Sequence, residues 1–488
     1  MNHRIVLFVL CLAVFSGPCF VTAEEKSEEK APPEWKYKAD LLRPFWQGTV
    51  MQGESVLFIR DETTGESHAS VLFPILDVPV IHNSSGTVTY EAGRDFLWNR
   101  ESREIILPSD SRIPSRTTQE LRRPAKSQKY ELTHRDGNGE IFFGSRLEYA
   151  EMQVCVTYSH APDLWDGEVP KFDRASLPRT IDRLLSRKPV SIVVVGDSIS
   201  AGCNASGWAE GVPFQPAYPE LLRRNLAERF QGQVTMANPS VGGTDTAWVL
   251  NAIDQVVESK PDLVIIAFGM NDSAGRPAAE YRQNTEAVME KIRDRLPDVE
   301  FILVASMLGN ADWTRLQQPL FPQYRDALAS LSKPGVALAD LTSIWTGFLA
   351  LKKDWDQTGN GVNHPNDFGH RVYAQVLSAL LIPDGQPSAQ QEAAMTIQSG
   401  PLRFTEQRLL GNYTYSYACA AADLDEDGDL DLTSSDAEPN SNLYLLRNDG
   451  NGHFEHSFIQ KYSMEDNSRC DWSGMRSEIS TATGARML

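Results

Sequence analysis

A serine after a strand and a histidine before a helix are the first candidates for chemistry in this chain. Ser198 lies in the segment Gly-Asp-Ser-Ile-Ser at residues 196–200, directly after an apolar run. A serine hydroxyl becomes a useful nucleophile only when a neighbouring base takes its proton. His364, in the segment Asn-His-Pro-Asn, could supply that base. Because Gly-Asp-Ser is also a common turn, these two residues alone do not establish a nucleophile and its base. The segments that accompany them supply the further support.

Two further segments carry hydrogen-bond donors. Residues 238–244 read Asn-Pro-Ser-Val-Gly-Gly-Thr, and a glycine such as Gly243 lets a backbone N–H approach a ligand closely. Residues 269–272 read Gly-Met-Asn-Asp, in which the Asn271 amide can donate. Donors that converge on a developing oxyanion lower the barrier of acyl transfer. These segments therefore predict an acyl-transfer site if the fold brings them to Ser198.

Several neighbouring residues have plainer interpretations. Asp197 and Asp272 are expected to hold turns by accepting hydrogen bonds from loop N–H groups. His370 is expected to cap or pack the last helix. Three loop aromatics either line a substrate cleft or are partly buried packing: Trp208, Phe214 and Trp313.

The elements that must position these side chains alternate between strand and helix. Helices are expected at residues 218–230 and 278–296. Strands are expected at five apolar runs, residues 190–195, 234–237, 263–268, 301–305 and 336–338. Apolar strands joined by helical crossovers predict an α/β fold with a doubly wound parallel sheet. The active site of such a sheet lies beyond the carboxyl ends of its strands, where all four segments fall.

The four segments, in this order on alternating strands and helices, resemble the SGNH/GDSL hydrolase superfamily over roughly residues 189–383, within a domain assigned to residues 185–383. The resemblance implies a flavodoxin-like sheet and a serine esterase. It makes Ser198 the nucleophile and His364 the general base and then the general acid. It also implies an oxyanion hole formed by the backbone N–H groups of Ser198 and Gly243 and the side chain of Asn271.

One position departs from the family pattern. The family usually has an aspartate three residues before the histidine, and this chain has Gly361. An orienting acid fixes the imidazole tautomer and stabilises the imidazolium. Asp354 or Asp356 could replace it, or a backbone carbonyl could, which would leave a Ser–His dyad. We favour the dyad because no other carboxylate occupies the family position.

The amino-terminal third has a different composition. Residues 1–23 read as a signal peptide, with a basic start, a short apolar run and small residues before the cleavage point, so a secreted or periplasmic protein is expected. Residues 24–34 are a charged linker. Residues 35–160 contain short strands, at 55–60, 70–73 and 86–90, broken by turns, which predicts an accessory β-sandwich.

The carboxyl-terminal part begins with a linker at residues 384–400. Residues 401–460 resemble the FG-GAP/VCBS repeat, the calcium-bearing blade of a β-propeller, so one partial propeller unit is expected. Hard cations bind several oxygen ligands from one short loop. The resemblance implies Ca²⁺ ligands at Asp423, Asp425, Asp427 and Asp431. Residues 461–488 fit no blade pattern and are interpreted as a disordered or frame-shifted tail.

Overall composition narrows the classes of function. The formal net charge of −19 argues against nucleic acid as a partner, because phosphate contacts need clustered cations. No segment after the signal is long and apolar enough for a membrane helix. The four cysteines beyond the signal show no metal-binding spacing and are either disulfide-bonded or separate buried thiols.

The sequence therefore predicts an exported esterase that removes acyl groups, acetyl above all, from a carbohydrate, with no cofactor for catalysis. A lipase or a thioesterase of the same fold is an alternative. A calcium-dependent adhesion or binding protein with an inactive hydrolase domain is another, favoured by Gly361 and opposed by the intact Ser198 and His364. The oligomeric state is left open.

Overall fold

A computed structural model describes residues 35–383 and, in the carboxyl-terminal part, residues 416–422, 424, 430–436, 442–448 and 454–461. The chain divides into two compact units, Met1–Ala393 and Ala394–Leu488. Within the described residues, no helix is long and apolar enough to cross a membrane. The expected signal peptide, both linkers and the tail after residue 461 lie outside the described residues.

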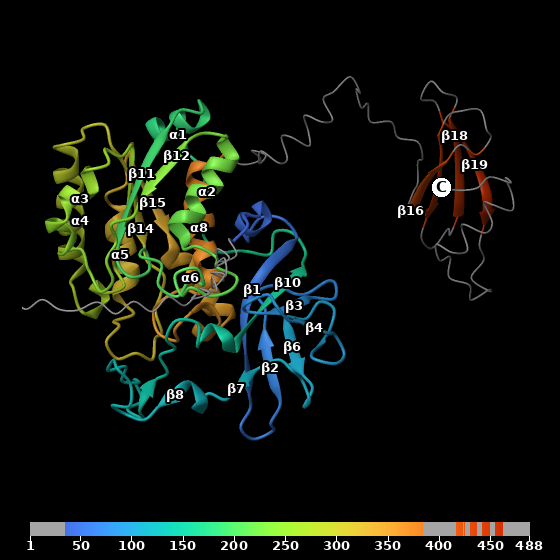
Figure 1. Cartoon of the computed structure of the whole chain (residues 1–488), viewed down its shortest axis with the longest axis horizontal. Helices are drawn as coiled ribbons and strands as arrows, with labels where there is room; N and C mark the ends of the chain where they lie inside the picture. Colours follow the sequence, from blue (N-terminus) through green and yellow to red (C-terminus); the bar gives the residue numbers. More distant parts are fainter. Residues whose placement is uncertain are drawn as a thin grey trace, which may run out of the picture. The chain divides into compact units, whose positions relative to one another are not determined.

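A five-stranded parallel sheet forms the centre of the first unit (Figure 1). Its order is β12-β11-β13-β14-β15, which is the flavodoxin-like order 2-1-3-4-5. The prediction of a doubly wound parallel sheet is thus confirmed. The strands are β11 (Val190–Gly196), β12 (Val234–Ala237), β13 (Leu263–Ala267), β14 (Glu300–Ala305) and β15 (Val336–Asp340).

Alternating side chains of β11 enter two different cores, so the sheet is covered on both faces. Ile192 and Val194 belong to the core under α2 and α8, whereas Val193 and Val195 belong to the core under α3, α4 and α5. Figure 1 shows α3 and α4 on one side of the sheet and α2 and α8 on the other. The helices are α1 (Pro178–Leu185), α2 (Tyr218–Phe230), α3 (Ile253–Val257), α4 (Ala278–Arg293), α5 (Leu320–Ala329), α6 (Leu341–Leu351), α7 (Asp354–Gln357) and α8 (Asp367–Leu381).

The amino-terminal strands form one eight-stranded sheet, whereas the sequence predicted a sandwich of two. The long strand β1 causes this difference, because its first part pairs with β10 and its last residues pair with β2 and β7. The strands are β1 (Val50–Arg60), β2 (Ser67–Ser70), β3 (Val80–Asn83), β4 (Thr89–Tyr90), β5 (Leu97–Trp98), β6 (Glu104–Leu107), β7 (Ser115–Arg116) and β10 (Gln153–Ser159). A separate pair consists of β8 (Arg122–Arg123) and β9 (Glu140–Ile141).

The amino-terminal sheet and the parallel sheet share one hydrophobic core. Val56 and Phe58 of β1 belong to the same buried cluster as Phe368 and Val372 of α8. Polar contacts also join the two parts: Arg371 of α8 donates to the carbonyls of residues 52 and 53, at 3.0 and 2.6 Å. The accessory sheet is therefore built into the unit that carries the candidate active site.

A buried ion pair lies at the same junction. Lys352, after α6, contacts the carboxylate of Glu54 in β1, and both side chains are almost fully buried. Lys352 also donates to the Ser55 carbonyl at 3.0 Å, and Glu54 accepts from the Tyr158 hydroxyl at 2.6 Å. These hydrogen bonds compensate for the desolvation of the two charges.

The second unit contains a four-stranded antiparallel meander in the order β16-β17-β18-β19. This is the strand arrangement of one propeller blade, although the FG-GAP/VCBS assignment itself stays a prediction. The strands are β16 (Ser416–Ala422), β17 (Asp431–Asp436), β18 (Asn442–Asn448) and β19 (Phe454–Lys461).

In the first unit, Cys155 and Cys203 are free thiols, as one of the two alternatives for the cysteines expected.

Candidate active site

Ser198 lies in a tight turn at the carboxyl end of β11. The Asp197 carboxylate accepts from the backbone N–H of Ile199 at 2.9 Å, so this aspartate holds the turn as expected. Gly196 has no room for a side chain, since an added Cβ would lie within 3 Å of Ser200 and of the Ala267 carbonyl. The turn places Ser198 at the carboxyl-terminal edge of the parallel sheet, where the other candidate residues also lie.

His364 lies within hydrogen-bond distance of the candidate nucleophile. Its Nε2 is 2.9 Å from the Ser198 Oγ, and its Nδ1 is 2.7 Å from the Oδ1 of Asn204. Burial, reinforced by the nearby His370, lowers the pKa of His364 to about 3. The imidazole is therefore neutral near pH 7 and able to accept a proton.

The glycine segment lies beside the same serine, and Asn271 binds the end of that segment. The backbone N–H of Val241 donates to the Gly196 carbonyl at 3.1 Å, which fixes the segment beside β11. A Cβ added at Gly242 would lie 3.6 Å from the Cβ of Ser198, and Gly243, with φ of +79°, is exposed at the rim. The Asn271 amide donates to the Thr244 carbonyl at 2.8 Å. An amide nitrogen carries two N–H groups, so this bond leaves one for a ligand.

Asp272 and His370 support the loops around the site. The buried Asp272 carboxylate accepts from the Thr246 hydroxyl and the Arg276 guanidinium, both at 2.6 Å, which holds the loop after the glycine segment. His370 is fully buried, stacks on Tyr218 and approaches the Cys203 carbonyl at 3.3 Å. Both residues thus have the supporting roles that the sequence predicted.

Neither of the carboxylates considered for orienting His364 binds that ring, because its two nitrogens face Ser198 and Asn204. Asp356 accepts from the Leu57 backbone N–H at 2.8 Å and lies 3.8 Å from Lys352. Burial raises the pKa of both Asp354 and Asp356 to about 6. Both carboxylates lie near the junction between the amino-terminal sheet and the part of the chain that carries the candidate active site.

Gly361 leaves no space for the family's acid. Its φ is +85°, and an added Cβ would overlap the Phe142 carbonyl oxygen and lie 2.7 Å from the Tyr149 ring. Phe142 and Tyr149 come from the segment before β10, so the accessory part of the chain occupies the place of an aspartate side chain. The observed packing therefore leaves no room for an acid at position 361.

Two asparagines at the site were missed by sequence reasoning. Asn204 lies in the loop after Ser198, and Asn360 accepts from the backbone N–H groups of Val362, Asn363 and His364 at 2.9, 3.0 and 3.3 Å. Asn360 therefore shapes the histidine loop. The available signal was weak: Asn204 is six residues beyond the serine, and nothing in its spacing predicts a contact with His364.

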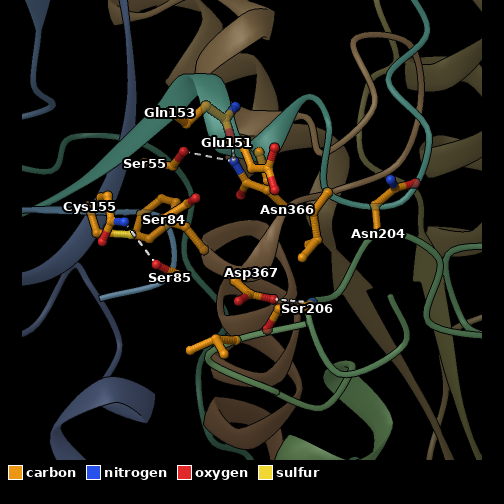
Figure 2. Close-up of a pocket in the computed structure, with 15 residues that line it drawn as sticks. Ser55, Ser84, Ser85, Glu151, Gln153, Cys155, Asn204, Ser206, Asn366 and Asp367 are labelled. Carbon is orange, nitrogen blue, oxygen red and sulfur yellow. Dashed lines mark hydrogen bonds between the residues drawn. The ribbon is translucent and has the colours of Figure 1, made fainter. Parts of the chain in front are cut away.

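A cavity of about 400 Å³ opens beside Asn204, between the accessory sheet and α8 (Figure 2). Ten of its fifteen lining residues carry hydroxyl, amide or carboxylate side chains, although more of the lining surface is apolar than polar. Figure 2 shows Ser84, Glu151 and Asp367 around this space. The full lining is Ser55, Asn83, Ser84, Ser85, Leu147, Ala150, Glu151, Gln153, Cys155, Asn204, Ser206, Val212, Asn366, Asp367 and Phe368.

The three loop aromatics differ in exposure. The Trp208 side chain is 46% exposed, whereas Phe214 and Trp313 are partly buried and pack on the main core. Only Trp208, among these three, is therefore available to a substrate as a broad apolar surface.

Of the expected Ca²⁺ ligands, only Asp431 lies within the described residues. Its buried carboxylate accepts from the backbone N–H groups of Leu424 and Asn448, at 2.9 and 2.8 Å. Asp423, Asp425 and Asp427 lie outside the described residues. The described residues contain no cluster of three or more metal-ligating side chains.

Comparison with known proteins relates part of this chain to one family of hydrolases. Residues 194–372 match the GDSL-like Lipase/Acylhydrolase family. The match supports a GDSL-type hydrolase in this part of the chain. An arylesterase from Vibrio mimicus is 32% identical to this chain over 111 residues, which are 22% of this chain and 52% of that protein. The chain thus spans about half the length of this curated relative.

Solved structures resemble this chain more distantly. A two-domain esterase active on acetylated mannans is 15% identical, with 57% of this chain and 74% of that chain covered at a TM-score of 0.35. A variant of an acetyl-xylooligosaccharide esterase from Geobacillus is 18% identical, with 39% and 94% covered at a TM-score of 0.34. The family match supports the prediction of an enzyme that hydrolyses ester bonds.

Proposed function

We propose that this protein is a serine esterase in which Ser198 is the nucleophile and His364 the base. The observation that carries the proposal is the 2.9 Å contact between the Ser198 Oγ and the His364 Nε2, in a site where the imidazole is neutral. Gly242 lies beside the same serine, and the Asn271 amide binds the Thr244 carbonyl at the end of that exposed glycine segment.

In the proposed reaction, His364 takes the hydroxyl proton as the Ser198 oxygen attacks the ester carbonyl. The resulting oxyanion accepts hydrogen bonds from the backbone N–H groups of Ser198 and Gly243 and from the Asn271 side chain. The intermediate collapses to an acyl-enzyme, and His364 returns its proton to the leaving alcohol. Water, activated by the same histidine, then releases the acid and restores the serine.

We propose an acylated carbohydrate, above all an acetylated one, as the substrate of this exported enzyme. The cavity that Asn204 lines is the candidate site for the sugar, although its lining includes neither Ser198 nor His364. Its hydroxyl, amide and carboxylate groups, such as Ser84 and Glu151, are suited to hydrogen-bond the hydroxyls of a sugar. A lipase or thioesterase remains the alternative within the fold. We also propose, as a separate property, that Asp423, Asp425, Asp427 and Asp431 bind Ca²⁺, which a calcium titration of the full chain tests.

Hydrolysis of p-nitrophenyl acetate tests the proposal directly. The Ser198→Ala variant should lose activity while its circular dichroism spectrum stays unchanged. An organophosphonate should label Ser198 alone in the wild type. Labelling at another residue, together with activity in the alanine variant, would exclude the assignment. An inactive wild type on acyl esters of every class would instead favour the calcium-dependent binding protein.

A further inference from the structure

We infer that Asn204 takes the part of the missing acid: its side-chain carbonyl holds the His364 ring and sets which ring nitrogen carries the proton. The inference deepens the proposed function and depends on it for its kinetic consequences. The tautomer of the His364 ring does not depend on the class of substrate.

Two backbone carbonyls fix the orientation of the Asn204 amide. Its Nδ2 lies 2.9 Å from the Arg146 carbonyl oxygen and 3.1 Å from the Gly359 carbonyl oxygen. Both partners can only accept, so the NH₂ group must point at them. The other amide atom, Oδ1, is therefore the one that faces His364 at 2.7 Å.

A carbonyl oxygen can only accept a hydrogen bond, and this selects one tautomer of His364. The ring nitrogen that faces Asn204 must carry the proton, so Nδ1 is the donor. The opposite nitrogen, Nε2, then presents its lone pair to the Ser198 hydroxyl at 2.9 Å. This is the tautomer that a general base requires, and a neutral residue provides it where an aspartate usually does.

The backbone around Asn204 favours this residue type. Its φ is +67°, a conformation that asparagine adopts more readily than most residues, and only 4% of its surface is exposed. Gly359 allows the close approach, since an added Cβ there would lie 2.7 Å from the Asn204 Cβ. The accessory segment supplies Arg146, and its Phe142 carbonyl closes the family's acid position at Gly361. The same segment thus blocks the acid and anchors its substitute.

Asn204 and the usual aspartate differ in charge. Both fix the tautomer, but only a carboxylate stabilises the imidazolium that forms during the reaction. The substitution therefore separates two functions of the third residue, and the Asn204→Asp variant would restore the second. A carboxylate at this position would place an oxygen against the Arg146 and Gly359 carbonyls, so the variant also tests how far the two anchors can adjust.

The experiment combines kinetics with ¹⁵N NMR of histidine-labelled full-length protein, in which the His364→Gln spectrum identifies the His364 signals. In the wild type, the Nδ1 of His364 should be protonated and Nε2 bare. Asn204→Ala and Asn204→Gly should lower kcat by roughly 10- to 10⁴-fold with little change in KM, and both tautomers should appear. Glycine adopts φ of +67° without strain, so it separates loss of the acceptor from loss of the loop.

Asn225→Ala is the matched control, because Asn225 is equally buried and binds Tyr37 and Ser378 away from His364. It should leave the His364 tautomer and kcat unchanged. Asn204→Asp should move the acid limb of kcat/KM to higher pH. A wild-type ring protonated at Nε2, or a kcat within about threefold of the wild type in both Asn204 variants, overturns the inference. An Nδ1–H signal in a protein without esterase activity would overturn the proposed function alone.

Discussion

Restoring the family's aspartate at position 361 should destabilise this protein, and the surroundings of Gly361 allow the loss in the free energy of unfolding to be calculated. The Gly361→Ala variant puts a residue with a side chain at φ of +85°. This conformation costs an ordinary residue about 1–2 kcal/mol. The new Cβ would also overlap the Phe142 carbonyl, and overpacking of this kind costs about 1–3 kcal/mol more. We expect Gly361→Ala to lower the free energy of unfolding by about 2–5 kcal/mol.

Gly361→Asp should be worse, since it adds a carboxylate to a buried place without a designed partner, at a further cost of about 1–3 kcal/mol. Urea unfolding followed by tryptophan fluorescence measures the loss, and p-nitrophenyl acetate hydrolysis measures the activity. Gly93→Ala is the matched control: Gly93 has φ of +84° but an added Cβ would meet nothing within 4 Å. It should lose only the conformational part, about 1–2 kcal/mol.

A Gly361→Asp variant as stable as the wild type would refute this reasoning about the Phe142 carbonyl. Increased activity in that variant would show that an acid can reach His364 from the family position, which would contradict the role of Asn204 as well. Equal losses in Gly361→Ala and Gly93→Ala would assign the whole cost to the backbone conformation and none to the overlap.

Four further outcomes are expected. Asn271→Ala should lower kcat by roughly 10²- to 10³-fold with little effect on KM, which steady-state kinetics measures. Burial lowers the pKa of His364 to about 3, so the base stays unprotonated at mildly acidic pH. The value of kcat/KM should therefore fall only as the pH drops through about 3. A fall in kcat/KM near pH 6.5, the usual histidine pKa, would contradict this. Lys352→Ala should destabilise the first unit by about 3–5 kcal/mol, because it leaves the buried Glu54 carboxylate unpaired, and a double variant that adds Glu54→Gln should recover part of the loss in urea unfolding. Ser84→Trp, which fills the cavity beside Asn204, should raise KM for an acetylated oligosaccharide while leaving p-nitrophenyl acetate hydrolysis unchanged; an equal effect on both substrates would remove the cavity from substrate binding.

The parallel sheet could be predicted from sequence because its information is local. The strand predicted at residues 234–237 and the helix predicted at residues 218–230 have the observed bounds of β12 and α2. The amino-terminal sheet was harder, because the strand β1 changes partners along its length and no residue type marks that change. A pattern of short strands and turns is compatible with one sheet or with two.

In the candidate site, too, local motifs could be predicted from the sequence, whereas contacts between distant segments could not. Ser198 and His364 lie in motifs whose order along the chain predicts that they meet, and the structure places them 2.9 Å apart. Asn204 could not be found in this way, because its contact with His364 depends on a loop conformation and on the Arg146 carbonyl from a distant segment. The sequence alone shows only that Gly361 replaces an acid, whereas the room at that position depends on Phe142, which lies more than two hundred positions earlier.

The junction between β1 and α8 has a consequence for the time course of synthesis. Arg371 donates to the carbonyl of residue 52, a separation of 319 residues along the chain. A ribosome adds about 5–20 residues per second, so Arg371 is synthesised about 16–64 seconds after residue 52. During that interval Val56 and Phe58, which end up fully buried, have no α8 to cover them. The nascent amino-terminal third should therefore need a chaperone for most of the time that the rest of the protein is being made.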